Sequence, residues 1–192
     1  ENMTEICVEV KENLEKVIDI LKNLGYMFDE RYVIHDTYYT TFKESDLKTI
    51  SYKDLLNGSL IIRNIVGNSG VSTNIVYKNK TLDNNGNVIN EIKTKLKIDD
   101  EEKAKTIFTN VGMTCWCDYI NENIVYKKDD IALTLQKVEN LGVFLEIEEY
   151  PSIKDKKEED KFTILSNLAK SLNINLGEDY SVKKPYLFLK KH

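Results

Sequence analysis

Two glutamates stand two positions apart in the apolar run GVFLEIEEY, near the carboxyl end of the sequence. If this run forms a strand, Glu146 and Glu148 share one face, because side chains alternate across a strand. On a surface strand both carboxylates would face water, as one side of an antiparallel sheet commonly does. On a strand whose charged face is enclosed, they would instead belong to a ligand site. The pair alone does not distinguish these two interpretations.

The same alternation recurs in other segments that predict strands. Acidic and basic side chains occupy one face while aliphatic or neutral side chains occupy the other, and these charged positions include Glu5, Glu9, Lys11, Arg63, Lys78, Glu91 and Lys93. Two arrangements produce this pattern. Either the aliphatic faces meet in a core and the charges look outward, or helices cover the aliphatic outside and the charges line a polar interior.

The elements that must position these residues follow from hydrophobic periodicity. Strict alternation or β-branched and aromatic enrichment predicts strands near residues 4–11, 31–42, 58–66, 72–82, 87–98, 114–128, 130–138 and 142–150. Apolar residues at helical spacing predict helices over 12–25, 99–113 and 156–172, with Gly25 and Gly112 placed to end the first two. Residues 43–57 are polar, and we expect a loop with a helical turn there. The final residues, 185–192, are expected to form a short last element.

This order of elements predicts an α+β fold. We expect eight or nine antiparallel strands in a closed or nearly closed β-barrel, with flanking helices. Each amphipathic helix needs an apolar surface to lie upon, which favours the arrangement with an enclosed polar interior. An ordinary open sheet with helices on one side gives the same alternation, so the pattern alone leaves both arrangements open.

Composition excludes several classes of protein. The 192 residues suffice for one domain, which we expect to span 3–192, with Glu1 and Asn2 as a remnant of an expression tag. The net charge of −5, with basic residues scattered, argues against nucleic-acid binding. Three cysteines without a C-x-x-C pair indicate neither a disulfide framework nor a zinc site. No apolar run has the length of a membrane helix and no leader opens the chain, so we expect a cytoplasmic protein without membrane contact.

Several segments together resemble the CYTH family of triphosphate tunnel metalloenzymes, which includes class IV adenylyl cyclases and thiamine triphosphatases. MTEICVEVK resembles the family's opening E-x-E-x-K strand, HDTYYTTF its D-x-Y-Y-D-T stretch, and SLIIRN its L-R-I-R strand. IVYKNK is similar to the strand that offers an inward lysine, and VINEIKT to the R-x-E region. VENLGVFLEIEEY repeats the order of the family's last acidic strand. These matches cover nearly the whole chain in the family's order.

Departures from the family pattern concern charged positions. Cys7 stands where the second acid of the first motif is expected, unless the register slips by two residues so that Glu9 and Lys11 form the matched pair. Ile61 replaces the first arginine of L-R-I-R, which leaves Arg63. Gln136 stands where an aspartate is usual. Because of these substitutions, the resemblance supports the family's fold more strongly than it supports the family's activity.

The resemblance implies metal-assisted attack at phosphorus in a charged tunnel. A triphosphate requires Lys and Arg for its oxygens, and Mg²⁺ or Mn²⁺ requires carboxylate oxygens. As metal ligands the resemblance implies Glu5, Glu9, Glu91, Glu146 and Glu148. As substrate-binding residues it implies Lys11, Arg63, Lys78 and Lys184, with Glu9 and Lys11 as the catalytic pair. Glu91 could alternatively orient a lysine.

Three functions remain open at this point. The first is an enzyme that hydrolyses an inorganic or organic triphosphate with Mg²⁺ or Mn²⁺, with class IV adenylyl cyclase chemistry as a variant. The second is an impaired tunnel protein that binds a phosphorylated ligand without efficient turnover. The third is an interaction domain whose charged face meets water. A small-molecule triphosphate is the expected partner, and a homodimer is left open.

Overall fold

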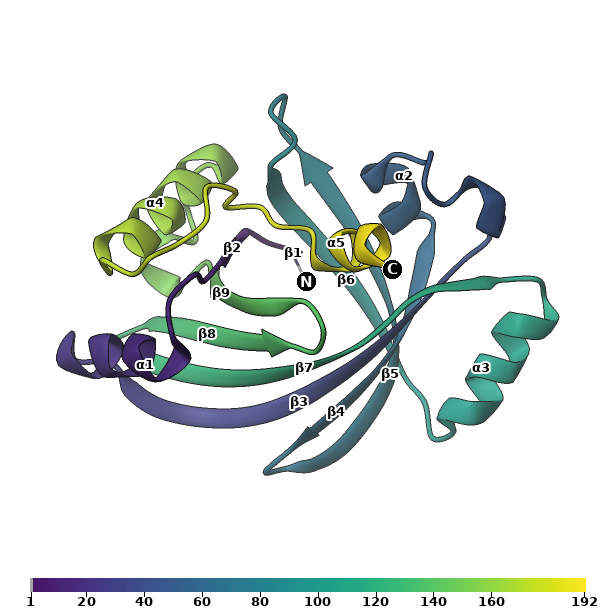
Figure 1. Cartoon of the computed structure of the whole chain (residues 1–192), viewed down its shortest axis with the longest axis horizontal. Helices are drawn as coiled ribbons and strands as arrows, with labels where there is room; N and C mark the ends of the chain where they lie inside the picture. The colour runs from purple at the N-terminus through teal and green to yellow at the C-terminus, as the bar shows by residue number, and fades with distance from the viewer. Residues whose placement is uncertain (1) are drawn as a thin grey trace.

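A nine-stranded antiparallel sheet forms the centre of the computed structural model, which describes residues 2–192. The strands follow the predicted alternation: β1 (Asn2–Met3), β2 (Glu5–Glu9), β3 (Met27–Thr40), β4 (Ser59–Gly67), β5 (Gly70–Leu82), β6 (Val88–Lys97), β7 (Thr114–Lys128), β8 (Ile131–Val138) and β9 (Gly142–Glu148). Their order across the sheet is β1-β6-β5-β4-β3-β7-β8-β9-β2. The sheet curls into a nearly closed barrel (Figure 1), which confirms the predicted α+β barrel.

The amino-terminal residues close the barrel. β1 pairs with β6 at one edge of the sheet and β2 pairs with β9 at the other, with only Thr4 between β1 and β2. The Thr4 hydroxyl donates to the Ile89 carbonyl at 2.9 Å, and the Glu149 amide donates to the Thr4 carbonyl at 2.8 Å. One continuous stretch of chain, residues 2–9, therefore pairs with β6 through β1 and with β9 through β2.

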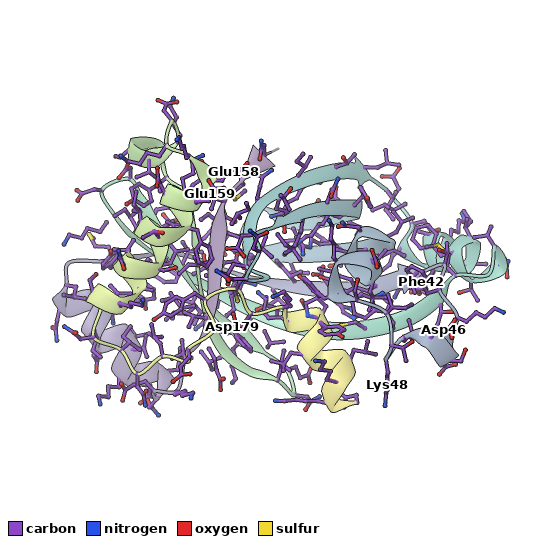
Figure 2. All side chains as sticks on the ribbon, turned by 90° about the horizontal axis from the view of Figure 1, so that it is seen from above. Phe42, Asp46, Lys48, Glu158, Glu159 and Asp179 are labelled. Carbon is purple, nitrogen blue, oxygen red and sulfur yellow. The ribbon has the colours of Figure 1, made fainter. Side chains whose placement is uncertain are left out.

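A carboxyl-terminal segment, residues 174–182, covers the free edge of β2. The Cys7 amide donates to the Tyr180 carbonyl at 3.0 Å, and the Val182 amide donates to the Cys7 carbonyl at 2.9 Å. The Ser181 hydroxyl accepts from the Val88 amide of β6 at 2.7 Å, so this closing segment also joins β2 to β6. Figure 2 labels Asp179 on this segment, between the helix that begins at Glu158 and the last helix of the chain.

The helices divide between the outside of the barrel and one of its ends. They are α1 (Leu14–Asn23), α2 (Tyr52–Asn57), α3 (Glu101–Asn110), α4 (Glu158–Ser171) and α5 (Lys184–Lys191), with 3-10 turns η1 (Glu44–Asp46) and η2 (Pro151–Ile153). α1 and α4 cover aliphatic outer faces at one side of the sheet and α3 covers another at the opposite side (Figure 1). α1 and α3 end as predicted, because Gly25 and Gly112 adopt φ values of +92° and +90°. Within residues 2–192 no helix combines the length and the apolar character needed to cross a membrane.

The barrel interior has two halves of opposite character. Ile61, Val76 and Phe144 share the inward faces of their strands with charged residues two positions away, yet they pack into an apolar cluster. α2 and α5 contribute Leu55, Leu56 and Leu187 to the same cluster and so close that end of the barrel. The predicted interior was polar throughout. It is polar in only one half, because the helices that close the other end exclude water there.

We predict that Thr4→Val lowers the free energy of unfolding by about 1–3 kcal/mol, because it leaves the buried Ile89 carbonyl without a donor at the barrel closure. Thr163→Val is the matched control, since its hydroxyl bonds to the Glu159 carbonyl on the exposed surface of α4. Urea denaturation of both variants tests this. An equal loss in the two would contradict a special role for the closure.

Candidate functional site

A cavity of about 130 Å³ occupies the polar half of the barrel. Strands β2 to β9 all contribute side chains to its wall, and α2 and residues 182–185 close it at one end. Six basic and four acidic side chains line it: Arg63, Lys78, Lys80, Lys93, Lys183, Lys184, Glu5, Asp36, Glu146 and Glu148. The cavity therefore has a basic excess although the whole chain carries a net charge of −5.

Three carboxylates converge on one wall of this cavity. Glu5 and Glu148 are directly opposite one another on β2 and β9, and Glu146 precedes Glu148 on the same face. One oxygen from each lies within 4.8 Å of the others. Hard oxygen donors so arranged suit Mg²⁺ or Mn²⁺, which accept carboxylates and retain several waters. The acidic strand of the sequence thus faces an enclosed cavity, where its carboxylates could hold a metal.

These carboxylates resist ionising together. Burial, followed by the Glu146 and Glu5 charges, raises the pKa of Glu148 to about 7, although Glu148 keeps contact with solvent. Burial and the Glu91 and Glu146 charges likewise raise the pKa of Glu5. Burial also opposes ionisation of Glu146, but the ammonium groups of Lys184, Lys93 and Lys78 together outweigh it, and the pKa of Glu146 falls below its usual value. A divalent cation would relieve the repulsion within this group.

Three lysines surround a single buried glutamate on the adjoining wall. The Glu91 carboxylate is 1% exposed and lies 2.8 Å from the Lys80 ammonium, 3.1 Å from that of Lys93 and 3.6 Å from that of Lys78. Lys80 is directly opposite Glu91 on β5, and Lys78 is directly opposite Lys93. Burial raises the pKa of Glu91, but the three ammonium groups lower it far more. Glu91 therefore stays ionised and holds three cations close together.

A bidentate ion pair fixes the arginine of the cavity. Arg63 donates from Nε to Asp36 Oδ1 at 2.8 Å and from Nη2 to Asp36 Oδ2 at 2.7 Å. The two residues are directly opposite on β4 and β3, and Asp36 is 2% exposed. This pairing leaves the remaining guanidinium nitrogen of Arg63 available to a ligand oxygen.

The carboxyl-terminal helix adds one more cation to the cavity. The Lys184 ammonium lies 3.3 Å from Glu146 Oε2 and also donates to the Gln136 side-chain carbonyl. The Lys183 ammonium instead donates to the Ser181 carbonyl at 3.3 Å and lies 5.1 Å from the centre of the Tyr52 ring. Two consecutive lysines thus enter the cavity with different partners.

The structure brings most, but not all, of the proposed site residues together. Glu5, Arg63, Lys78, Glu146, Glu148 and Lys184 line the cavity, and Glu91 contacts three of its lysines. Glu9 and Lys11 do not join them. β2 ends at Glu9, and there the chain leaves the barrel wall toward α1, so both side chains are exposed beside Gly177 and Glu178. Cys7 is the residue that follows Glu5 on the inward face.

Sequence reasoning overlooked three residues of the cavity. Lys80 is absent from the predicted site, Lys93 appears only among the charged strand positions, and Asp36 lies within the HDTYYTTF segment but is not predicted to pair with Arg63. A signal existed for the first, because Lys80 follows Lys78 at the two-residue spacing of a strand face. The pairing of Asp36 with Arg63 depends on the register between β3 and β4, which the sequence does not reveal.

Comparisons with known proteins agree with this architecture. No protein-family model matches the chain. The chain is 32% identical over 194 residues to a Methanocaldococcus jannaschii protein provisionally named an adenylate cyclase, covering 98% of this chain and 99% of that protein. The PH1819 protein of Pyrococcus horikoshii superposes with a TM-score of 0.73 at 19% identity, over 98% of this chain and 99% of that chain. HpAC1 of Hippeastrum, provisionally an adenylyl cyclase and described as having a dominant triphosphatase activity, superposes with a TM-score of 0.58 at 12% identity, over 98% and 95%. The two structural likenesses bear on the fold alone.

We predict that Glu91→Gln lowers the free energy of unfolding at pH 7 by about 3–5 kcal/mol, because it leaves three buried ammonium groups without their shared anion. The folded state lowers the pKa of Glu91, so its contribution is present above the unfolded pKa and is lost as the pH falls below about 4.5. Denaturant titrations at pH 7 and pH 3.5 measure both effects. A stability difference that does not narrow at the lower pH would contradict this account.

We predict the opposite pH dependence for Glu148→Gln in the metal-free protein. The folded state raises the pKa of Glu148 from 4.5 to about 7, so the wild type loses stability as the pH rises through this interval. The variant carries no charge there and should melt at a higher temperature than the wild type at pH 8, with little difference at pH 4.5. Thermal melts in EDTA check this, and added Mn²⁺ should reverse the order at pH 8.

Proposed function

Because the chain belongs to the CYTH family of triphosphate tunnel metalloenzymes, we propose that it hydrolyses a triphosphate with the help of Mg²⁺ or Mn²⁺. The observation that carries this proposal is the meeting of an acidic triad and a lysine cluster in one enclosed cavity. HpAC1, which shares this fold, is described as having a dominant triphosphatase activity, and the reaction proposed here is of the same type. The provisional name of the M. jannaschii relative supports a nucleotide as one candidate substrate.

The basic wall would bind the phosphate chain. Lys78, Lys80 and Lys93 lie on neighbouring strands, and their spacing is fixed through Glu91, so their positions do not depend on the ligand. Arg63 is oriented by Asp36 and would present its free nitrogen to a phosphate oxygen. Positively charged groups held in place in this way stabilise the charge that develops on phosphate oxygens during transfer.

The acidic wall would hold the metal. Glu5, Glu146 and Glu148 supply the oxygen ligands, and the cavity adjoins them with the lysine cluster on its other side. A bound divalent ion would neutralise phosphate oxygens and orient the attacking water. The three carboxylates would set the position of such an ion relative to the lysines on the other side of the cavity.

A nucleophile supplied by the protein would have to come from the side chains that line the cavity. Cys7 is the candidate by residue type, but burial raises the pKa of its thiol to about 12. The thiol therefore stays protonated at neutral pH and is a poor nucleophile and a poor metal ligand. Direct attack by water on the phosphate chain is the reaction that these side chains support.

A second candidate is a tunnel protein that binds a triphosphate without turning it over. Cys7 and Gln136 place neutral side chains on the cavity wall where the family pattern has acids, and Ile61 lies in the apolar half of the interior. Both candidates bind a triphosphate, but only the enzyme converts it to a product. Phosphate release indicates a hydrolase, pyrophosphate with a cyclic nucleotide indicates a cyclase, and tight binding without either product indicates the binder.

We predict that the purified protein releases phosphate from tripolyphosphate in the presence of Mn²⁺ or Mg²⁺. Arg63→Ala should lower kcat/KM by about 10²- to 10³-fold, because it removes an oriented donor to the phosphate oxygens. Arg31→Ala is the matched control, since Arg31 pairs with Glu122 and keeps 59% of its side chain exposed. Steady-state phosphate release from both variants tests this. Equal rates in the two variants would count against a phosphate-binding cavity.

A further inference from the structure

One cation lies directly on the acidic triad. The Lys184 ammonium is 3.3 Å from Glu146 Oε2, and both side chains are largely buried, with 12% and 18% exposed. The other two triad members lack so close a partner among the ion pairs of residues 2–192: Glu5 lies 3.9 Å from Lys80, and Glu148 appears in none of them. Among the ion pairs of the described residues, the contact of Lys184 with Glu146 is therefore the shortest that involves a proposed metal ligand of the triad.

A divalent ion and this ammonium would compete for the same carboxylate. Mg²⁺ or Mn²⁺ binds carboxylate oxygens at about 2.0–2.1 Å, which places it within the few ångströms around Glu146 that Lys184 now occupies. Two cations that close repel one another strongly in a cavity of low dielectric constant. Binding of the metal at Glu146 would therefore favour movement of the Lys184 side chain away from this carboxylate.

The backbone of Lys184 stays in place during such a change. Ser181 and Val182, directly before the lysine pair, are tied to Val88 and Cys7 through the closing segment. Lys184 is also the first residue of α5, whose Leu187 packs into the apolar half of the interior. The long side chain is then the part that moves, and a phosphate group bound in the cavity would offer it a new anion.

We propose that Lys184 is a resident counter-cation of the acidic triad that the metal must displace, so that metal binding releases this lysine to the phosphate chain. The inference rests on the proposed metal and triphosphate site. A single side chain, that of Lys184, would then couple binding of the metal to binding of the phosphate chain. In the metal-free protein, Lys184 thereby offsets part of the negative charge of the triad, at the expense of metal affinity.

Mn²⁺ titration without any substrate tests the proposal, with the electron paramagnetic resonance signal of free Mn²⁺ as the readout. Lys184→Met removes the competing charge and should tighten Mn²⁺ binding by about 5- to 150-fold, the range typical of coupled sites. Lys184→Gln, which can retain a hydrogen bond to Gln136, should also bind more tightly. It provides a second variant if the first does not fold.

Lys183→Met is the matched control for metal affinity. It removes the same charge from the adjacent residue of the same cavity wall, but its ammonium contacts Ser181 and Tyr52 and not the triad. If only the Lys184 variants bind Mn²⁺ more tightly than the wild type, the result supports displacement of the Lys184 ammonium by the metal. Equal tightening in the Lys183 variant would reduce the effect to net charge and overturn the proposal, as would unchanged, weaker or absent Mn²⁺ binding in the Lys184 variants.

A parallel assay of phosphate release by the wild type separates this inference from the proposed function. If the wild type hydrolyses no triphosphate while Lys184→Met binds Mn²⁺ more tightly, the hydrolase proposal fails and the counter-cation role stands. If the wild type hydrolyses tripolyphosphate but the Lys184 variants bind Mn²⁺ no more tightly than the wild type, the counter-cation role fails and the hydrolase proposal stands.

Discussion

The site depends on the ion pairs that the buried Glu91 carboxylate makes with three lysines. Lys78 and Lys93 are directly opposite on adjacent strands, a placement that like charges disfavour. Glu91, from the same strand as Lys93, makes this placement tolerable because it lies within 3.6 Å of both and of Lys80. The protein thus surrounds one anion with three cations on the wall proposed to bind phosphate. An apolar replacement of the whole cluster could be as stable, but it would bind no phosphate.

The two halves of the interior show how one strand pattern serves two purposes. On β9, Phe144 faces the apolar half, and Glu146 and Glu148 face the cavity, although all three point inward. The change of character follows the position of α2 and α5, which close one end of the barrel with aromatic and aliphatic side chains. The apolar half supplies burial, and the polar half keeps room for water and ligands. The charged cavity is therefore supported by a core of its own inside the barrel.

Local patterns predicted the strands, the first two helix ends and the acidic pair, because side-chain alternation and glycine caps are properties of short segments. The same alternation did not predict where the interior turns apolar, since Ile61 and Arg63 share a face and differ only in what covers them. Glu9 and Lys11 fitted the family motif by sequence. They lie outside the cavity because β2 ends at Glu9. The partners of Cys7 in residues 174–182 are remote in sequence, and such pairings leave no local signal.

The pairing of the closing segment with β2 affects how the chain folds while it is being synthesised. The edge of β2 that receives Tyr180 and Val182 is synthesised well before these partners, which lie far later in the chain. During that interval β2 presents unpaired amide and carbonyl groups, the feature that makes strand edges prone to pairing with other chains. Such distant pairings also slow folding, since a long loop must close first. Lys184 follows directly after this segment, so it joins the other cations of the cavity only after residues 174–182 have been synthesised.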